Sequence, residues 1–373
     1  MSNSQQPIPQ LYIGLMSGTS ADGIDLALVD FSDNKIELKA SFYQAYSKEI
    51  QQEITSLYQT KANELELAFS LDKKLAQLFA EAIKRFLQQE HLSAADIAAI
   101  GNHGQTIRHR PNQEHAFTLQ IGCNQTLASR TDIRVIGDFR QKDIVLGGQG
   151  APLVPAFHQA IFADIEDDVF IVNIGGIANI TYLPKDKNNA VLGFDTGPGN
   201  GLMDEWYQQH FSGLYDENGN WAASGQIDQA LLSAFLSDSY FKQQAPKSTG
   251  REVFHLPWIQ QKINRKNCNA EDVQATLCAL TSATISTEIK RIAHHGKVFL
   301  CGGGAYNKHL KNQLKQQLNT FEFTNLPDTI PNDALEAMAF AWLAYAYDKN
   351  IFGNIPAVTG AYEQTVLGHC IFP

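Results

Sequence analysis

The chain has 373 residues, of which 44% are hydrophobic, and this exceeds the length that one hydrophobic core usually supports, so we expect two domains. Its formal net charge of −10 argues against binding to nucleic acid or membrane surfaces, because phosphate-rich partners would be repelled. Five scattered cysteines without a disulfide framework, and no apolar run of membrane-spanning or signal-peptide type, favour a cytoplasmic location.

The first half of the chain predicts an antiparallel opening followed by helices and strands. Residues 12–31 are typical of two strands around a tight turn, and alternation at 35–43 adds a third strand to this meander. Residues 64–89 carry apolar side chains at three- and four-residue spacing, which predicts an amphipathic helix packed on a sheet. Buried strands are expected at 97–107, running into a loop, and at 131–139.

The second half repeats this order of elements. Residues 169–184 predict strand, glycine turn and strand, and residues 189–196 predict a third strand before a helix that begins after Pro198. Later elements are a helix at 272–295, a strand at 297–304, and helices at 305–318 and 333–347. The fold class is therefore α/β, with two similar lobes of mixed sheet plus helices and a cleft between the lobes. The predicted domains are residues 1–160 and 161–373. In an alternative arrangement, the last segment of the second domain packs back on the first lobe.

The turn between the first two strands has the chemistry of a phosphate-binding loop. Glycines bring backbone N–H groups close to an anion, hydroxyls add donors, and Asp22 or Asp25 can hold a hydrated Mg²⁺. The alternative is an ordinary hairpin, in which glycine and aspartate are common. The candidate nucleotide-binding residues of this turn are Gly18, Thr19, Ser20, Ala21, Asp22, Gly23, Ile24 and Asp25.

Two further glycine turns lie in the second half. One separates the strands of residues 169–184, and the other joins a buried strand to a helix, whose N-terminus can approach a nucleotide. Neither fits a dinucleotide-binding or P-loop motif. The candidate nucleotide-binding residues of these turns are Gly175, Gly176, Asn179, Gly302, Gly303, Gly304 and Asn307, and Gly197 in the stretch of residues 193–204 is a further candidate.

The stretch GFDTGPGNGLMD, residues 193–204, contains the candidate catalytic residue, Asp195. We expect a strand to end at Asp195 and a helix to begin with Pro198, so that the carboxylate projects from the strand end into the cleft and acts as a base. The alternative is a helix-capping aspartate in a strand-to-helix turn.

These turns, together with GNHGQTIRHRP, GDFRQKDIVLGGQGAPLVPAFH and PNDALEAMAFAWLA, resemble the anhydro-N-acetylmuramic acid kinase family nearly end to end. The resemblance implies the duplicated-lobe fold of sugar kinases, actin and heat-shock ATPases, with ATP and Mg²⁺ as cofactors. It also implies a homodimer, and a reaction that hydrolyses the 1,6-anhydro bond of the sugar and phosphorylates O6 during cell-wall recycling. In that reaction Asp195 would activate the water that attacks C1.

The family's sugar carries a lactyl carboxylate, for which the chain offers several cations between residues 108 and 142. Arg140 is our preferred partner, because a guanidinium binds a carboxylate bidentately, and Asp138 would bind a sugar hydroxyl or hold Arg140. His103 and Gln105 would hydrogen-bond the sugar, with a satisfied buried histidine as the alternative for His103. Glu336 is a further candidate for substrate contact, against a residue on the helix surface.

Two other functions remain open at this stage. A conventional hexose or amino-sugar kinase would use Asp195 to deprotonate a sugar hydroxyl directly. A non-sugar ATPase would use lobe closure to move a partner.

Overall fold

The structure is a computed structural model, and it describes residues 10–32, 35–245, 247–250, 253–263, 268–326 and 330–373. The contacts divide the described residues into two compact units. Unit 1 combines the chain up to Ile161 with the chain from Ile330 onwards, and unit 2 begins at Phe162 and ends at Leu326. Among the described helices, none is long and apolar enough to cross a membrane.

Unit 1 contains a seven-stranded mixed sheet in the order β12-β6-β4-β1-β2-β3, with β5 paired to β4. Its strands are β1 (Leu11–Ser17), β2 (Gly23–Asp30), β3 (Glu37–Ala45), β4 (Ile97–Arg110), β5 (Phe117–Ile121), β6 (Val135–Gly137) and β12 (His369–Ile371). The predicted meander is confirmed, because β1, β2 and β3 pair antiparallel in sequence. Strand β4 lies parallel to both β1 and β6.

The loop expected after residue 107 is absent, because β4 continues to Arg110. Its first half pairs with β1 as far as Gln105, and from Gln105 onward it pairs antiparallel with β5. The second partner strand keeps the polar sequence NHGQTIRHR extended, although its composition is typical of a loop.

The helices of unit 1 are α1 (Lys48–Ser56), α2 (Glu64–Gln89), α3 (Asn124–Thr131), α4 (Phe139–Val145), α5 (Val154–Ile161), α12 (Leu335–Asp348) and α13 (Pro356–Thr359), with short 3₁₀ helices η2 (Ala94–Asp96) and η6 (Asn332–Ala334). Helix α2 spans the predicted residues 64–89. Its buried stripe, which includes Leu71, Leu75, Phe79 and Phe86, joins the hydrophobic core of the sheet.

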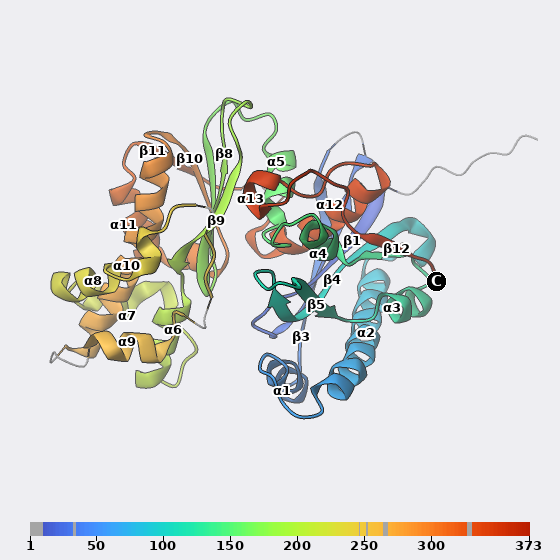
Figure 1. The fold of residues 1–373 in the computed structure, drawn as a ribbon, viewed down its shortest axis with the longest axis horizontal. Coiled ribbons are helices and arrows are strands. Elements are labelled where there is room, and N and C mark those ends of the chain that lie inside the picture. The colour runs from blue at the N-terminus through green and yellow to red at the C-terminus, as the bar shows by residue number, and fades with distance from the viewer. Residues whose placement is uncertain (1–9, 33–34, 246, 251–252, 264–267, 327–329) are drawn as a thin grey trace, which may run out of the picture. The chain divides into compact units, whose positions relative to one another are not determined.

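Helix α12 follows unit 2 in the chain but packs on β1, β2 and β4 of unit 1 (Figure 1). Two strand glycines allow this close approach. A Cβ at Gly14 would overlap the Ala337 carbonyl, and a Cβ at Gly101 would overlap the Phe340 carbonyl. The first residues of α12 therefore lie over the strands that carry the first glycine turn.

Unit 2 contains a five-stranded sheet in the order β11-β10-β7-β8-β9. Its strands are β7 (Val169–Ile174), β8 (Ile177–Leu183), β9 (Leu192–Pro198), β10 (Gly296–Cys301) and β11 (Phe321–Thr324). Its helices are α6 (Gly201–His210), α7 (Asn220–Ser224), α8 (Gln229–Leu236), α9 (Leu256–Ile263), α10 (Ala270–Ile292) and α11 (Lys308–Gln317), with 3₁₀ helices η3 (Glu217–Gly219), η4 (Ser239–Lys242) and η5 (Gly303–Tyr306). The antiparallel opening β7-β8-β9 matches the predicted order of strands.

The expected end of a strand at Asp195 is wrong. Strand β9 pairs with β8 as far as Pro198, so Asp195 lies in the middle of a strand. Pro198 is a strand residue and does not open α6, which begins at Gly201. Proline is tolerated in β9 because this strand lies at the edge of the sheet.

Candidate active site

The first glycine turn is a tight reversal between β1 and β2, which pair as far as Met16 and Asp25. The N–H of Ala21 donates to the Gly18 carbonyl at 3.1 Å, and Ala21 adopts a positive φ of 52°. Thr19, Ser20 and Asp22 are exposed, whereas Ala21, Gly23 and Ile24 are buried. The turn therefore offers hydroxyl and carboxylate groups to solvent, and its buried members act through packing.

Asp25 is half-buried in an acidic environment. Burial raises the pKa of Asp25 to about 7, and the carboxylates of Asp22, Glu336 and Asp333 add to the shift. Glu336, in the first turn of helix α12, is therefore close enough to the first glycine turn to act on Asp25. Glu336 is exposed at the surface, but the protein around it still raises the pKa of its carboxyl by desolvation. The Arg140 guanidinium opposes that rise.

This acidic environment fits a hydrated Mg²⁺ that arrives with a nucleotide. Mg²⁺ usually keeps several waters and binds through one or two carboxylates plus substrate phosphates. Burial and the neighbouring carboxylates both raise the pKa of Asp25, and a cation bound beside it would oppose that rise. Among the described residues, no group of three or more His, Cys, Asp or Glu side chains could hold a metal ion without such phosphates.

The predicted sugar ligands His103 and Arg140 contact each other. The Nε2 atom of His103 accepts from Arg140 Nη2 at 2.9 Å and from Arg140 Nε at 3.2 Å. Arg140 Nη1 donates to the Gly150 carbonyl at 2.7 Å. A guanidinium has five N–H groups, so these contacts leave one on each terminal nitrogen, a pair that can bind a carboxylate bidentately.

The His103 ring is 7% exposed and therefore buried. Burial, followed by the Arg140 charge, lowers the pKa of His103 to about 3. The imidazole is neutral, and because Nε2 accepts, its proton is on Nδ1. Among the described residues, Nδ1 makes no hydrogen bond within the usual distance and angle limits, although the backbone of Gly104 and Ser17 lies near enough to oppose the lowering of the pKa.

Gln105 and Asp138 have different surroundings. Gln105 is fully buried, and its amide bonds to Ser17 and Gly18 at the first turn. Asp138 is exposed, precedes α4 with a φ of 55°, and accepts from the Asn124 amide at 3.4 Å. Arg140 is held by His103 and Gly150. Among the described contacts, none joins Asp138 to Arg140.

Asp143 is a functional candidate that the sequence reasoning missed. Its carboxylate is fully buried and accepts the N–H of Gly150 at 2.7 Å, the Asn354 amide at 2.8 Å and the Thr359 hydroxyl at 2.7 Å. These bonds fix the segment whose Gly150 carbonyl holds Arg140. The spacing of Asp143 and Gly150 in GDFRQKDIVLGGQG was the available signal, but the partners near residue 359 lie far along the chain.

In unit 2 the glycine segments predicted to bind the nucleotide converge. The Gly175 carbonyl accepts the N–H of Asn200 at 2.7 Å, and the Gly176 carbonyl accepts the N–H groups of Gly199 and Gly201 at 3.0 and 3.1 Å. The turn after β7 is thereby tied to the start of α6. Gly304 joins them, because its lack of a side chain lets η5 approach Ile174 closely.

Asp195 is half-buried and firmly held within β9. Its Oδ2 accepts the N–H of Thr249 at 2.9 Å, its N–H donates to the Lys247 carbonyl at 3.1 Å, and its own carbonyl accepts the Tyr240 hydroxyl at 2.7 Å. The segment at 247–249 is anchored in turn, since Lys247 Nζ donates to Glu288 at 2.8 Å with its side chain 1% exposed. The carboxylate is therefore preorganised by backbone contacts.

The other candidates of unit 2 have structural contacts. Asn179 pairs with Asp195 across β8 and β9, and Gly197 lies against the Phe241 ring. The Asn307 side chain accepts the N–H of Leu310 at 3.0 Å and so caps α11. Capping by Asn307 stabilises the helix that follows the third glycine turn.

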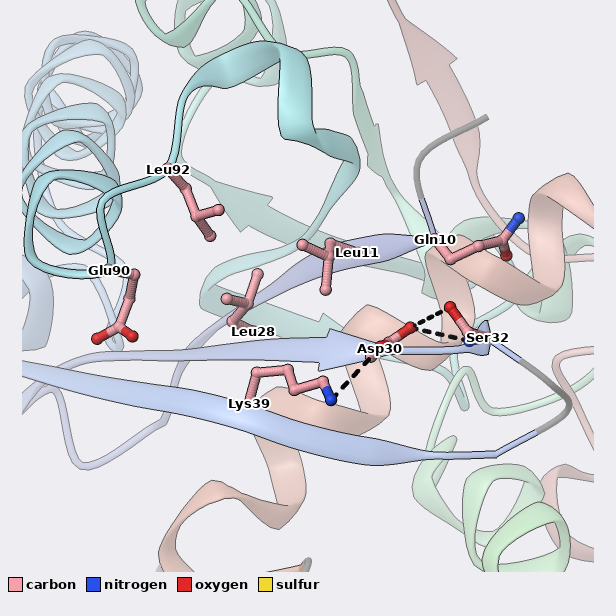
Figure 2. A pocket seen from close by; sticks show the side chains of 8 residues that line it. All are labelled: Gln10, Leu11, Leu28, Asp30, Ser32, Lys39, Glu90 and Leu92. Carbon is pink, nitrogen blue, oxygen red and sulfur yellow. Dashed lines mark hydrogen bonds and ion pairs between the residues drawn. The ribbon is translucent and has the colours of Figure 1, made fainter. Parts of the chain in front are cut away.

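A pocket of about 430 Å³ lies elsewhere in unit 1 (Figure 2). It is lined by residues of β1, β2 and β3 and by the end of α2, and none of the candidate residues above contributes to it. Asp30 in its wall accepts from the Ser32 hydroxyl at 2.6 Å and lies 3.5 Å from Lys39 Nζ. Its lining shares no residue with the candidate site, so it is separate from that site.

Comparison with known proteins adds the family to this geometry. Residues 10–373 match the family model described as anhydro-N-acetylmuramic acid kinase. The protein of that name from Colwellia psychrerythraea is 54% identical, covering 97% of both chains, and the one from Shewanella denitrificans is 48% identical, covering 96% of this chain and 98% of its own. Among solved structures, the chain resembles an activator of 2-hydroxyisocaproyl-CoA dehydratase from Clostridium difficile with bound ADPNP, at 15% identity and a TM-score of 0.47, covering 91% of this chain and 95% of that chain. On the full-length match, the chain belongs to the anhydro-N-acetylmuramic acid kinase family.

Proposed function

We propose that this protein opens the 1,6-anhydro bond of 1,6-anhydro-N-acetylmuramic acid and transfers the γ-phosphoryl group of ATP to O6. The products are N-acetylmuramic acid 6-phosphate and ADP. Family membership over residues 10–373 is the observation that carries this proposal. The reaction belongs to the recycling of cell-wall sugars.

The base in this reaction is Asp195. O6 is tied to C1 in the substrate, so water must form a bond to C1 while the C1–O6 bond breaks. The Asp195 carboxylate takes the proton of that water, and O6 uses the released electron pair to bond the γ-phosphorus as ADP leaves. The bond from the Thr249 N–H and the strand backbone on either side of Asp195 support this role, because they fix the carboxylate before the substrate arrives.

The sugar is held by the groups around Arg140. Its two remaining terminal N–H groups bind the lactyl carboxylate, and the Nδ1–H of the neutral His103 donates to the sugar. Nδ1 makes no hydrogen bond of normal geometry among the described residues, and this supports the assignment because a buried donor gains from an acceptor that a ligand supplies. Glu336 and Asp138 are the carboxylates for sugar hydroxyl groups.

In unit 1, the first turn would hold nucleotide phosphates. In unit 2, the converging glycine segments are a second candidate for nucleotide contacts, argued from their own geometry alone. Asp22 and Asp25 would hold Mg²⁺ through water, and bound there it would neutralise charge on the phosphates, which is the larger part of phosphoryl-transfer catalysis. Exposed Thr19 and Ser20 add backbone and hydroxyl donors. We further propose that the protein is cytoplasmic and that it works as a homodimer. The mass of the purified protein, measured by light scattering, tests the homodimer.

Turnover in ¹⁸O-labelled water tests the reaction. We expect label in the C1 hydroxyl of the 6-phosphorylated product, detected by mass spectrometry after early quenching. Incubation of unlabelled product in labelled water measures the background from anomeric exchange. Unlabelled early product would reject coupled hydrolysis and would favour a conventional sugar kinase.

A further inference from the structure

We propose that Gln105 is a positioning residue of the first turn and not a sugar ligand. Together with Tyr58 it holds the carbonyl groups of Gly18 and Thr19, so that the N–H groups of the next residues face the nucleotide phosphates. This inference rests on the proposed function, because it takes the first turn as part of the nucleotide site.

The amide of Gln105 is fully engaged by the turn. Its Oε1 accepts the Ser17 hydroxyl at 2.6 Å, and its Nε2 donates to the Gly18 carbonyl at 3.0 Å. A carbonyl can only accept, so the Gly18 contact fixes which end of the amide is nitrogen. The same Nε2 lies 3.3 Å from the Tyr58 hydroxyl as donor.

Tyr58 continues this network to the next peptide group. Its hydroxyl donates to the Thr19 carbonyl at 2.8 Å. Ser17 is likewise held from the other side, because its Oγ lies 2.8 Å from the Tyr46 hydroxyl. Side chains from β4 and from the segment after α1 therefore fix two consecutive carbonyl groups of the turn.

The orientation of these carbonyls decides where the turn's donors point. In a trans peptide the C=O and the following N–H lie in one plane and point in opposite directions. Holding the carbonyls of Gly18 and Thr19 inward thus turns the N–H groups of Thr19 and Ser20 outward, and both residues are exposed. Consecutive N–H groups of this kind form an anion-binding concavity.

The burial of Gln105 agrees with this role. Its side chain has no exposed surface, and both its donor and its acceptor atoms already bond to the protein. A sugar hydroxyl would have to displace one of these bonds. The same contacts predict that loss of the amide loosens the turn and leaves the groups around Arg140 in place.

Two variants from different elements separate the possibilities. Tyr58→Phe removes only the hydroxyl that donates to Thr19, and Gln105→Leu removes both amide functions. We expect each to weaken MgADP binding, measured by isothermal titration calorimetry, and to raise KM for ATP by about tenfold. KM for the anhydro-sugar should change less than about twofold, because the contacts that hold Arg140 do not involve Gln105 or Tyr58.

The matched control is Gln120→Leu. Gln120 lies on β5 beside β4 and bonds to the Thr106 and Thr118 hydroxyls, so it should leave both KM values unchanged. If Gln105→Leu raises KM for the sugar and leaves KM for ATP unchanged, the inference is overturned and Gln105 is a sugar ligand. Unchanged MgADP affinity in Tyr58→Phe would also overturn the inference. This second variant decides the test if Gln105→Leu does not fold.

The test also distinguishes this inference from the proposed function. If the wild-type protein binds MgADP but does not phosphorylate the anhydro-sugar, the proposed reaction fails. The MgADP affinities of the variants then still decide whether Gln105 and Tyr58 position the turn. If the wild-type protein binds no nucleotide, both proposals fall.

Discussion

The buried carboxylate of Asp143 accepts a hydrogen bond from the hydroxyl of Thr359 at 2.7 Å, across 216 positions of the chain. This contact joins the segment after α4 to the residues near α13 within unit 1. The Gln149 N–H adds a parallel bond to the Thr359 carbonyl at 2.8 Å. The backbone that holds Arg140 therefore depends on the C-terminal part of the chain.

Asp143→Ala should destabilise the protein strongly. The substitution leaves the Gly150 N–H, the Asn354 amide and the Thr359 hydroxyl without this acceptor, and each unsatisfied buried donor costs about 1–3 kcal/mol. Urea unfolding of the full chain measures the change in free energy. A loss below about 1 kcal/mol, the size of one ordinary hydrogen bond, would contradict this reading of the network.

Thr359→Val provides the matched comparison, because it removes one donor and keeps the shape of the side chain. We expect it to cost about 1 kcal/mol. The double variant should cost less than the two single changes added together, since both remove the same hydrogen bond. Strict additivity would mean that the Asp143–Thr359 bond contributes nothing.

Removing the imidazole of His103 should weaken sugar binding more than nucleotide binding. His103→Ala removes the imidazole acceptor of Arg140 and leaves the Gly150 carbonyl to orient the guanidinium, so its remaining N–H groups are less firmly directed. Hydrogen bonds to charged groups contribute about 1.5–3 kcal/mol, so we expect KM for the anhydro-sugar to rise by at least about tenfold. Steady-state kinetics with each substrate varied separately measures this split.

His103→Gln should lose less, because its amide oxygen can still accept from Arg140. The exposed His295 supplies the control, and His295→Ala should behave as wild type. Burial lowers the pKa of His103 to about 3, so the ring stays neutral and should add no inflection near pH 6.5 to the activity profile. An increase in KM for ATP alone would place His103 with the nucleotide.

Asp195→Asn should abolish most turnover while the fold survives. The asparagine oxygen can still accept the Thr249 N–H, but an amide cannot take a proton from water. We expect kcat to fall by about 10²- to 10⁴-fold, the usual contribution of a general base. Circular dichroism of the variant checks that unit 2 is folded.

Asp228→Asn is the control for this change of charge in the same unit. Asp228 caps α8 by accepting the N–H groups of Ala230 and Leu231, and asparagine caps equally well. Its turnover should match wild type. Near-normal kcat in Asp195→Asn would remove Asp195 as the base.

The sequence predicted best the elements that bury a single face, because one buried face leaves a regular hydrophobic pattern in the sequence. Helix α2 was predicted at its observed bounds, because its buried stripe contacts one face of a sheet. Strands β4 and β9 extend beyond their predicted ends. In both, pairing with another strand keeps polar or glycine-rich residues extended, and the identity of that partner is not written in the local sequence.

The contacts of the candidate site depend even more on distant residues. The motif around Arg140 identified a cation, but its acceptor on His103 lies in β4 and its neighbour Glu336 lies in α12. Gln105 was expected to bind the sugar because it follows the predicted strand end together with His103. Its amide bonds to Ser17 and Gly18 at the first turn, and this contact is the basis of the positioning role that we propose for it.

The buried His158 of α5 predicts a loss of stability in mild acid. Burial lowers the pKa of His158 to about 3, whereas an unfolded histidine has a pKa near 6.5. Between these values the unfolded chain binds a proton that the folded chain does not. The contribution of this residue is therefore fully present above about pH 6.5 and is lost as pH falls toward 3, by about 1.4 kcal/mol per pH unit.

Urea unfolding at pH 7 and pH 5 should show wild type losing about 2 kcal/mol more than His158→Phe, which keeps an aromatic ring but cannot titrate. The other depressed histidines, His103 and His109, are present in both proteins, so the comparison isolates His158. Equal losses in the two proteins would show that His158 does not titrate on unfolding in this range.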